Sequence, residues 1–183
     1  MHTRSEQIND ELLVLDWQSS DERSLQMLFD RWHPRLTRYA RRLTQNDDGA
    51  ADIVQESWLA MVKGIGRLDD PRAFSRWAYQ IVTRRTTDWI RHQQRRRKIE
   101  GPPPTEPIAS PVDGNPSVDD TDEIQAALAR LNEMFRTVLV LRYLEEMSVA
   151  EMAEILSLPA GTIKSRLHYA REAVRPYLTE KKS

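Results

Sequence analysis

The side chains most able to do chemistry in this chain are arginines interleaved with aromatic residues and threonines. They gather between residues 74 and 98, where Trp77 and Trp89 share one helical stretch with a run of cations. Aromatic rings can stack on unpaired bases, and cations neutralise phosphates. The pattern therefore favours contact with a nucleic acid. Both tryptophans could instead be core anchors. We prefer that role for Trp89, and for Trp77 both roles stay open.

A second basic segment lies near the C-terminus, between residues 148 and 171. Ser148 and Glu151 have the spacing of a capping box, which begins a helix. Pro159 then marks a turn because it lacks a backbone N–H. The helix after the turn has apolar residues on one face from Ile163 onward and polar residues elsewhere. This is the pattern of a helix-turn-helix, whose second helix can lie in a DNA major groove. A plain helical hairpin on the surface is the alternative.

Catalytic chemistry has little support in the sequence. The histidines are scattered at His2, His33, His92 and His168, and there is no His-x-x-x-His pair, carboxylate cluster or Gly-rich phosphate loop. Cysteine is absent, which excludes disulfides and thiolate metal sites. We therefore expect a protein that is not an enzyme and that holds no metal and no cofactor.

The composition fits one or two small helical domains. The chain has 183 residues, of which 39% are hydrophobic and 30% charged. The net charge of -1 hides an uneven distribution, because residues 100–123 contain acids and no Lys or Arg, with basic segments on both sides. No apolar run approaches the roughly 20 residues of a membrane span, and the first residues lack an apolar signal segment. We expect a cytoplasmic protein without membrane insertion.

Apolar periodicity predicts the helices that position these residues. In the first half we expect a short helix over 9–17, a long amphipathic one over 25–43 with a kink or junction at Pro34, and another over 51–62. Asp70 and Pro71, an N-cap followed by proline at the first helical position, begin the next helix. Six prolines and no periodicity over 101–120 predict a linker.

The second half is expected to contain a helix over 122–131, a buried helix from Phe135 to Tyr143 that Asn132 caps, and the helix-turn-helix, with Pro176 ending the last helix. The prediction is therefore an all-α fold of two small helical domains. They span residues 1–98 and 122–183, and a flexible, acidic, Pro-rich linker over 99–121 joins them.

Four stretches carry a resemblance to a known family: DELLVLDWQ, LFDRWHPRLTRYARRLT, ADIVQESWLAMVKGIGRLDDPRAFSRWAYQIVTRRTTDWIRHQQRRRK, and LARLNEMFRTVLVLRYLEEMSVAEMAEILSLPAGTIKSRLHYARE. With these, nearly the whole chain resembles a bacterial RNA polymerase sigma factor of the extracytoplasmic-function (ECF) group of the sigma-70 family. The resemblance implies a specificity subunit that binds core polymerase, through its clamp coiled coil and flap, and directs promoter-specific initiation on double-stranded and melted DNA.

The resemblance also assigns residues to three surfaces. The surface that binds core polymerase would comprise Asp52, Gln55 and Glu56, although the helix dipole alone could explain an acid at Asp52. The surface that reads and melts the minus-ten element would comprise Asp69, Arg72, Phe74, Arg76, Trp77, Gln80, Arg84, Thr87 and Arg91. The surface that reads the minus-thirty-five element would comprise Thr162, Lys164, Ser165, Arg166, His168 and Arg171.

Two departures from the family pattern have consequences. Ser157 stands in the turn where many relatives have glycine, so a left-handed conformation costs slightly more there. Only Trp77 is present where housekeeping sigma factors have an adjacent tryptophan pair, which implies stringent promoter choice and weaker intrinsic melting. The resemblance leaves open whether an anti-sigma protein binds. The alternative is a stand-alone helix-turn-helix regulator with an N-terminal regulatory domain.

Overall fold

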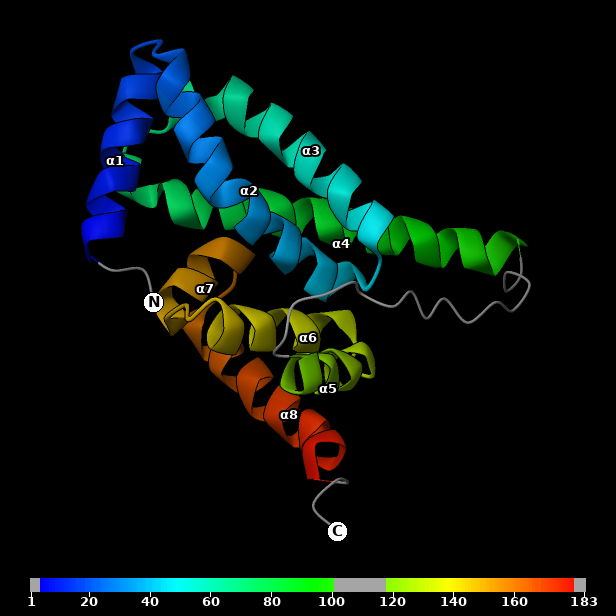
Figure 1. The fold of residues 1–183 in the computed structure, drawn as a ribbon. Coiled ribbons are helices and arrows are strands. Elements are labelled where there is room, and N and C mark those ends of the chain that lie inside the picture. Colours follow the sequence, from blue (N-terminus) through cyan, green and yellow to red (C-terminus); the bar gives the residue numbers. More distant parts are fainter. Residues whose placement is uncertain (1–3, 101–117, 180–183) are drawn as a thin grey trace.

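The computed structural model describes residues 4–100 and 118–179, and every element in those ranges is helical (Figure 1). The first half comprises α1 (Arg4–Gln18), α2 (Glu22–Thr44), α3 (Asp47–Gly64), two short 3-10 helices, η1 (Ile65–Arg67) and η2 (Pro71–Ala73), and α4 (Phe74–Glu100). The second comprises α5 (Val118–Ala129), α6 (Glu133–Leu139), the π-helical turn η3 (Val140–Leu144), α7 (Val149–Leu156) and α8 (Ala160–Thr179). The all-α prediction is confirmed.

The linker was predicted slightly too long. α4 runs past residue 98 and α5 begins at Val118, so helix occupies both ends of the 99–121 range. The rest of the predicted linker lies outside the described residues. Among the residues that are described, none of the helices combines the length and the apolar character needed to cross a membrane.

Side-chain caps mark three helix starts, of which those of α2 and α3 lie before the predicted ranges 25–43 and 51–62. Asp21 accepts the N–H of Arg23 to begin α2, and Asn46 accepts the N–H of Gly49 at 2.6 Å to begin α3. Ser148 and Glu151 form the complete capping box of α7, with N–H to oxygen distances of 3.2 and 2.8 Å. These side chains satisfy backbone donors that the first helical turn leaves without partners.

Two local predictions were wrong, those for Pro176 and Tyr143, and one of the two alternatives for Pro34 is excluded. α8 continues through Pro176, which therefore does not end the helix, and α2 continues through Pro34, so that no junction between helices lies there. In α2 the buried Trp32 and Leu36 on either side keep the chain helical, because packing offsets the lost hydrogen bond. Tyr143 is 53% exposed rather than buried. It lies in η3, whose wider π-helical turn shifts the register of the apolar face.

An aromatic cluster forms the centre of the first half. Trp32 packs edge-to-face on Phe74 and Tyr79, with ring centroids 5.5 and 6.0 Å apart, and Tyr39 meets Tyr79 at 4.9 Å. All four side chains are at most 1% exposed. The cluster joins α2 to the start of α4, and so fixes where α4 begins relative to the rest of the bundle.

The two halves share one continuous core. α7 packs on α4, and buried residues of the second half such as Leu141 and Met152 belong to the same apolar cluster as the aromatic residues of the first (Figure 1). The chain therefore forms a single closed body in which the helix-turn-helix of α7 and α8 lies under the α2–α4 layer.

Candidate nucleic-acid interface

A side chain of α1 holds the loop that precedes α4 in place. The side-chain amide of Gln18 donates to the carbonyls of Ile65 and Leu68, both at 2.9 Å. Asp70 then caps η2 by accepting from the backbone N–H of Arg72 at 3.0 Å and from its guanidinium at 2.9 Å. These bonds from Arg72 lower the pKa of the Asp70 carboxyl. No sequence pattern identifies this role of Gln18, because its partners lie 47 and 50 residues away.

The predicted minus-ten residues differ in how far they reach the surface. Four of them are exposed: Asp69, Arg72, Arg84 and Arg91. Four more are half-buried: Arg76, Trp77, Gln80 and Thr87. The ninth, Phe74, is a correction, since its side chain is 1% exposed and lies in the aromatic core, where DNA cannot reach it.

The roles of the two tryptophans of α4 separate in the structure. Trp89 packs against Gly49 of α3 so closely that a Cβ there would lie 2.4 Å from its ring, which makes it the core anchor that we preferred. Trp77 is half-buried and packs over Gly64, where a Cβ would lie 2.9 Å from its ring. One side of the Trp77 ring therefore packs in the core, and part of the side chain stays accessible near the loop that precedes α4.

One side of α3 is open to solvent over its whole length. Asp52, Gln55 and Glu56 are exposed, and Leu59 and Val62 continue the same stripe at helical spacing. Leu59 is 57% exposed and Val62 45%, and sequence reasoning had not assigned either residue to this surface. Their register from Asp52 could have identified them. Large apolar side chains left in water beside carboxylates are a mark of a surface that meets a protein partner.

Glu56 differs from the other two predicted residues on α3. Its carboxylate pairs with the guanidinium of Arg85 on α4 at 2.6 Å. This ion pair ties α3 to α4, so Glu56 has a structural partner that Asp52 and Gln55 are not shown to have.

The second predicted DNA surface lies on α8. Its apolar residues Ile163, Leu167 and Ala170 are buried, as predicted. On the outer face Lys164, Ser165, His168 and Arg171 are exposed, while Thr162 and Arg166 are half-buried. Sequence reasoning missed Tyr169, which is 60% exposed and meets the ring of His168 edge-on at 5.3 Å. Ser157 adopts the predicted left-handed conformation in the turn, with φ of 52°.

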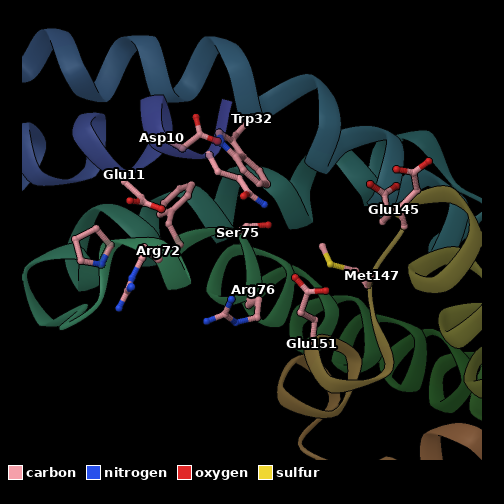
Figure 2. A pocket seen from close by; sticks show the side chains of 13 residues that line it. Asp10, Glu11, Trp32, Arg72, Ser75, Arg76, Glu145, Met147 and Glu151 are labelled. Atoms are coloured by element: carbon pink, nitrogen blue, oxygen red, sulfur yellow. The ribbon is translucent and has the colours of Figure 1, made fainter. Parts of the chain in front are cut away.

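A polar pocket of about 400 Å³ lies between the two halves (Figure 2). Arg72 of η2 and Ser75 and Arg76 of α4 line one side, and the other side is lined by Glu145 and Glu146, which precede α7, and by Glu151 within α7. On the α1 side, buried Asp10 accepts from the guanidinium of Arg31 at 2.6 Å and from the indole N–H of Trp32 at 3.1 Å. The pocket thus sets carboxylates opposite the cationic start of α4.

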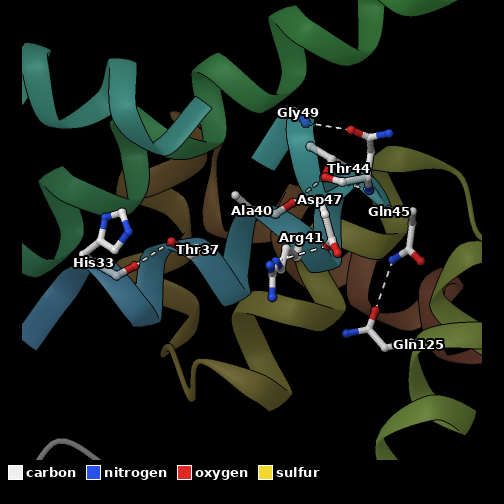
Figure 3. Close-up of polar contacts among 10 residues, drawn as sticks. His33, Thr37, Ala40, Arg41, Thr44, Gln45, Asp47, Gly49 and Gln125 are labelled. Carbon is white, nitrogen blue, oxygen red and sulfur yellow. Dashed lines mark hydrogen bonds and ion pairs between the residues drawn. The ribbon is translucent and has the colours of Figure 1, made fainter. Parts of the chain in front are cut away.

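Polar bonds also join the halves at the C-terminal end of α2 (Figure 3). Gln45 caps α2 in a left-handed conformation, and its amide donates to the side-chain oxygen of Gln125 on α5 at 3.2 Å. Arg136 of α6 donates to the carbonyl of Leu43 at 2.6 Å. Arg41 pairs with Asp47 at 3.1 Å within the first half. The two halves are therefore also joined at the C-terminal end of α2.

Comparison with known proteins identifies both halves. Residues 28–96 match the Sigma-70 region 2 family, and residues 121–174 match the family Sigma-70, region 4. The chain is 32% identical over 171 residues to the ECF RNA polymerase sigma factor SigW of Bacillus subtilis, which covers 87% of this chain and 91% of that protein. The chain belongs to the ECF group of sigma-70 RNA polymerase sigma factors. It directs promoter-specific transcription initiation.

Other relatives agree with this assignment. The ECF RNA polymerase sigma-E factor of Haemophilus influenzae is 29% identical to this sigma factor over 187 residues, covering 93% of this chain and 95% of that one. Among solved structures, CnrH in complex with the cytosolic domain of CnrY has a TM-score of 0.72 at 21% identity and covers 95% of this chain and 99% of that chain. RpoE of Bartonella quintana, in complex with the anti-sigma factor NepR, has a TM-score of 0.69 at 22% identity, covering 86% and 98%.

The candidate surfaces of the sigma factor divide between the two matched regions. The open side of α3 and the loop leading into α4 lie in region 2, and the outer face of α8 lies in region 4. The alternative of a stand-alone regulator with an N-terminal regulatory domain is set aside, because the first half is itself a sigma region.

Proposed function

We propose that this sigma factor binds core polymerase through the open side of α3. The supporting observation is the stripe that begins at Asp52 and Gln55 and continues to Leu59 and Val62, where apolar side chains stay in water beside polar ones. Such a mixed stripe suits a helical partner like the clamp coiled coil, because apolar contacts supply affinity and the polar end fixes orientation. Glu56 stabilises the packing of α3 on α4 through its ion pair with Arg85, rather than contacting core polymerase.

We propose that α4 and its loop read and melt the minus-ten element. Gln18 and Asp70 hold the loop rigid, so that Asp69 and Arg72 are presented in one conformation. A flipped base costs a few kcal/mol of unstacking, which a preformed loop can recover more fully than a mobile one. Farther along α4, exposed Arg84 and Arg91 are suited to phosphates of the upstream duplex.

The outer face of α8 is proposed to read the minus-thirty-five element in the major groove. Exposed Lys164 and Arg171 suit phosphates, whereas half-buried Arg166 is held close to the helix and suits a base edge. We add Tyr169 to this surface, since a ring exposed on the same face as His168 is placed to meet bases or sugars.

The proposed partners follow from the roles of these three surfaces. Core polymerase and promoter DNA are the two main partners, and the chain carries no catalysis of its own. It would act in the cytoplasm, where core polymerase works. An anti-sigma protein is a further proposed partner, since the solved relatives CnrH and RpoE are each complexed with another protein, NepR being named an anti-sigma factor.

The experiment that tests the proposal is transcription with purified core polymerase and a promoter library. Added protein should redirect initiation to a distinct promoter set, and failure to do so with any promoter would refute the function. Asp52→Ala with Gln55→Ala, and separately Leu59→Ala, should weaken core binding in a titration without changing the melting temperature. Asp30→Ala with Gln26→Ala is the matched control, because that exposed pair on α2 has the same chemistry.

A further inference from the structure

The last turns of α4 extend past the start of α3 (Figure 1). Trp89 packs against Gly49 in the first turn of α3, and α4 then continues over residues 90–100, which is about 16 Å of helix. Ile99 in this segment is 85% exposed. Core packing therefore does not explain why the chain stays helical here, and the good helix propensity of Gln, Arg and Lys does. We call residues 90–100 the projecting end of α4.

The projecting end is strongly cationic. Residues 90–99 include four arginines and one lysine and no acid. Arg84, Arg91 and Arg95 are exposed, and their spacings of seven and four residues place them on one face of the helix. Arg84 and Arg91 belong to the proposed minus-ten surface, whereas Arg95 does not. Arg95 therefore extends that row of cations by one turn onto the projecting end.

These arginines differ from two other cations of α4. Arg76 pairs with Glu154 of α7, and Arg85 pairs with Glu56 of α3, both at 2.6 Å. Within the described parts of the chain, no carboxylate forms an ion pair with Arg91 or Arg95. Their charges are therefore available to a ligand in solution.

Helix stability does not account for the position of these cations. A cation stabilises the negative end of the helix dipole only within the last turn. Arg91 and Arg95 lie nine and five residues before Glu100, at which α4 ends. They are thus too far from the end of the helix to act on its dipole, and the helix itself ends with an acid, which the dipole disfavours.

The length of the row matches a stretch of duplex DNA. From Arg84 to Arg95 the helix rises by about 16 Å. Since successive phosphates of one strand are about 3.4 Å apart along the axis of B-DNA, the row is as long as about five base pairs. Arg84 is proposed to contact the duplex just upstream of the minus-ten element. Continuing along α4 in the same direction, Arg95 reaches DNA that lies between the two promoter elements.

We propose that the projecting end of α4 binds the duplex between the minus-ten and minus-thirty-five elements. Arg95 contacts a backbone phosphate there, and the contact is independent of the bases because phosphates carry no sequence information. Asp88, which is exposed in the same row, opposes the contact through its negative charge. The inference rests on the proposed role of α4 at the minus-ten element, so its test separates the two.

The test compares the parent with Arg95→Ala, each bound to core polymerase, on two DNA probes from a promoter chosen in the library assay. Both probes carry the unpaired minus-ten strand. The long probe continues upstream as duplex through the spacer, and the short probe ends at the upstream edge of the minus-ten element. On the long probe the variant should bind about threefold more weakly at 50 mM salt and nearly equally at 200 mM, because each lost phosphate contact lowers the salt slope by about 0.9. On the short probe the two proteins should bind equally.

Two further variants control for charge. Arg23→Ala is the matched control, because Arg23 is an exposed arginine near the start of α2, outside the proposed binding surfaces. It should bind both probes as the parent does. Asp88→Asn removes the opposing charge and should bind the long probe more tightly than the parent. Circular-dichroism melting of all variants should match the parent, since the three side chains are exposed.

Each outcome decides one point. Equal affinity of Arg95→Ala and the parent for the long probe at 50 mM salt would overturn the inference and leave the role of α4 intact. An equal loss on both probes would also overturn it, because Arg95 would then act at the minus-ten element itself. So would a loss that changes when the spacer bases are replaced, since that indicates a base contact. If the parent fails to bind the short probe, the proposed role of α4 fails and the inference with it.

Discussion

Replacing Gly49 with alanine is expected to destabilise the protein, although the same change in most helices has the opposite effect. In an unobstructed helix, alanine is favoured over glycine by up to about 1 kcal/mol. Here the new Cβ would lie 2.4 and 2.7 Å from two atoms of the Trp89 ring and 3.0 Å from the capping oxygen of Asn46. Since carbon atoms pack at about 3.5–4.0 Å, the ring must withdraw by about 1 Å or more.

The displacement of the Trp89 ring determines whether the substitution stabilises or destabilises the protein. Overpacking of this kind costs about 1–3 kcal/mol, which exceeds the gain in helix propensity. A net loss of about 1–2 kcal/mol corresponds to a melting temperature lower by about 2–8 °C in a chain of this size. The same displacement moves α4 relative to α3, so core binding and minus-ten reading should weaken together.

The assay is thermal unfolding followed by far-ultraviolet circular dichroism, with Gly161→Ala as the control. No atom lies within 4 Å of the Cβ that this control would add in the first turn of α8, so its melting temperature should stay the same or rise slightly. If Gly49→Ala melts at or above the parent temperature, Trp89 is not packed against α3 as described, and its role as a core anchor is wrong.

Three further predictions concern single side chains. Asp10→Ala should lower stability by about 2–3 kcal/mol, because the indole N–H of Trp32 is left buried without an acceptor; denaturant unfolding within 0.5 kcal/mol of the parent would contradict this. Burial raises the pKa of the Tyr39 phenol, so the folded state keeps a proton that the unfolded state loses above about pH 10. Stability should be unaffected by this group below pH 10 and fall above it, and Tyr39→Phe should reduce that alkaline slope. Arg166→Ala should weaken minus-thirty-five binding by about 1–3 kcal/mol and relax sequence preference, whereas an equal loss on every duplex in a titration would show a phosphate contact.

The sequence predicted best what local chemistry determines. The capping box of Ser148 and Glu151, the Asn132 cap and the left-handed Ser157 each depend on residues a few positions apart, and all three are present. Resemblance to the sigma-70 family additionally predicted the two sigma regions. These features need no knowledge of the tertiary contacts, because side chain and backbone partner lie within one turn.

The sequence failed where long-range packing decides. Pro34 and Pro176 carry the local signal of an interrupted helix, yet both lie inside continuous helices. Phe74 is an aromatic residue of the kind that can contact DNA, but its ring packs against Trp32. Leu59 was not assigned to the exposed stripe of α3, because periodicity shows that a helix is amphipathic without showing how wide its buried stripe is.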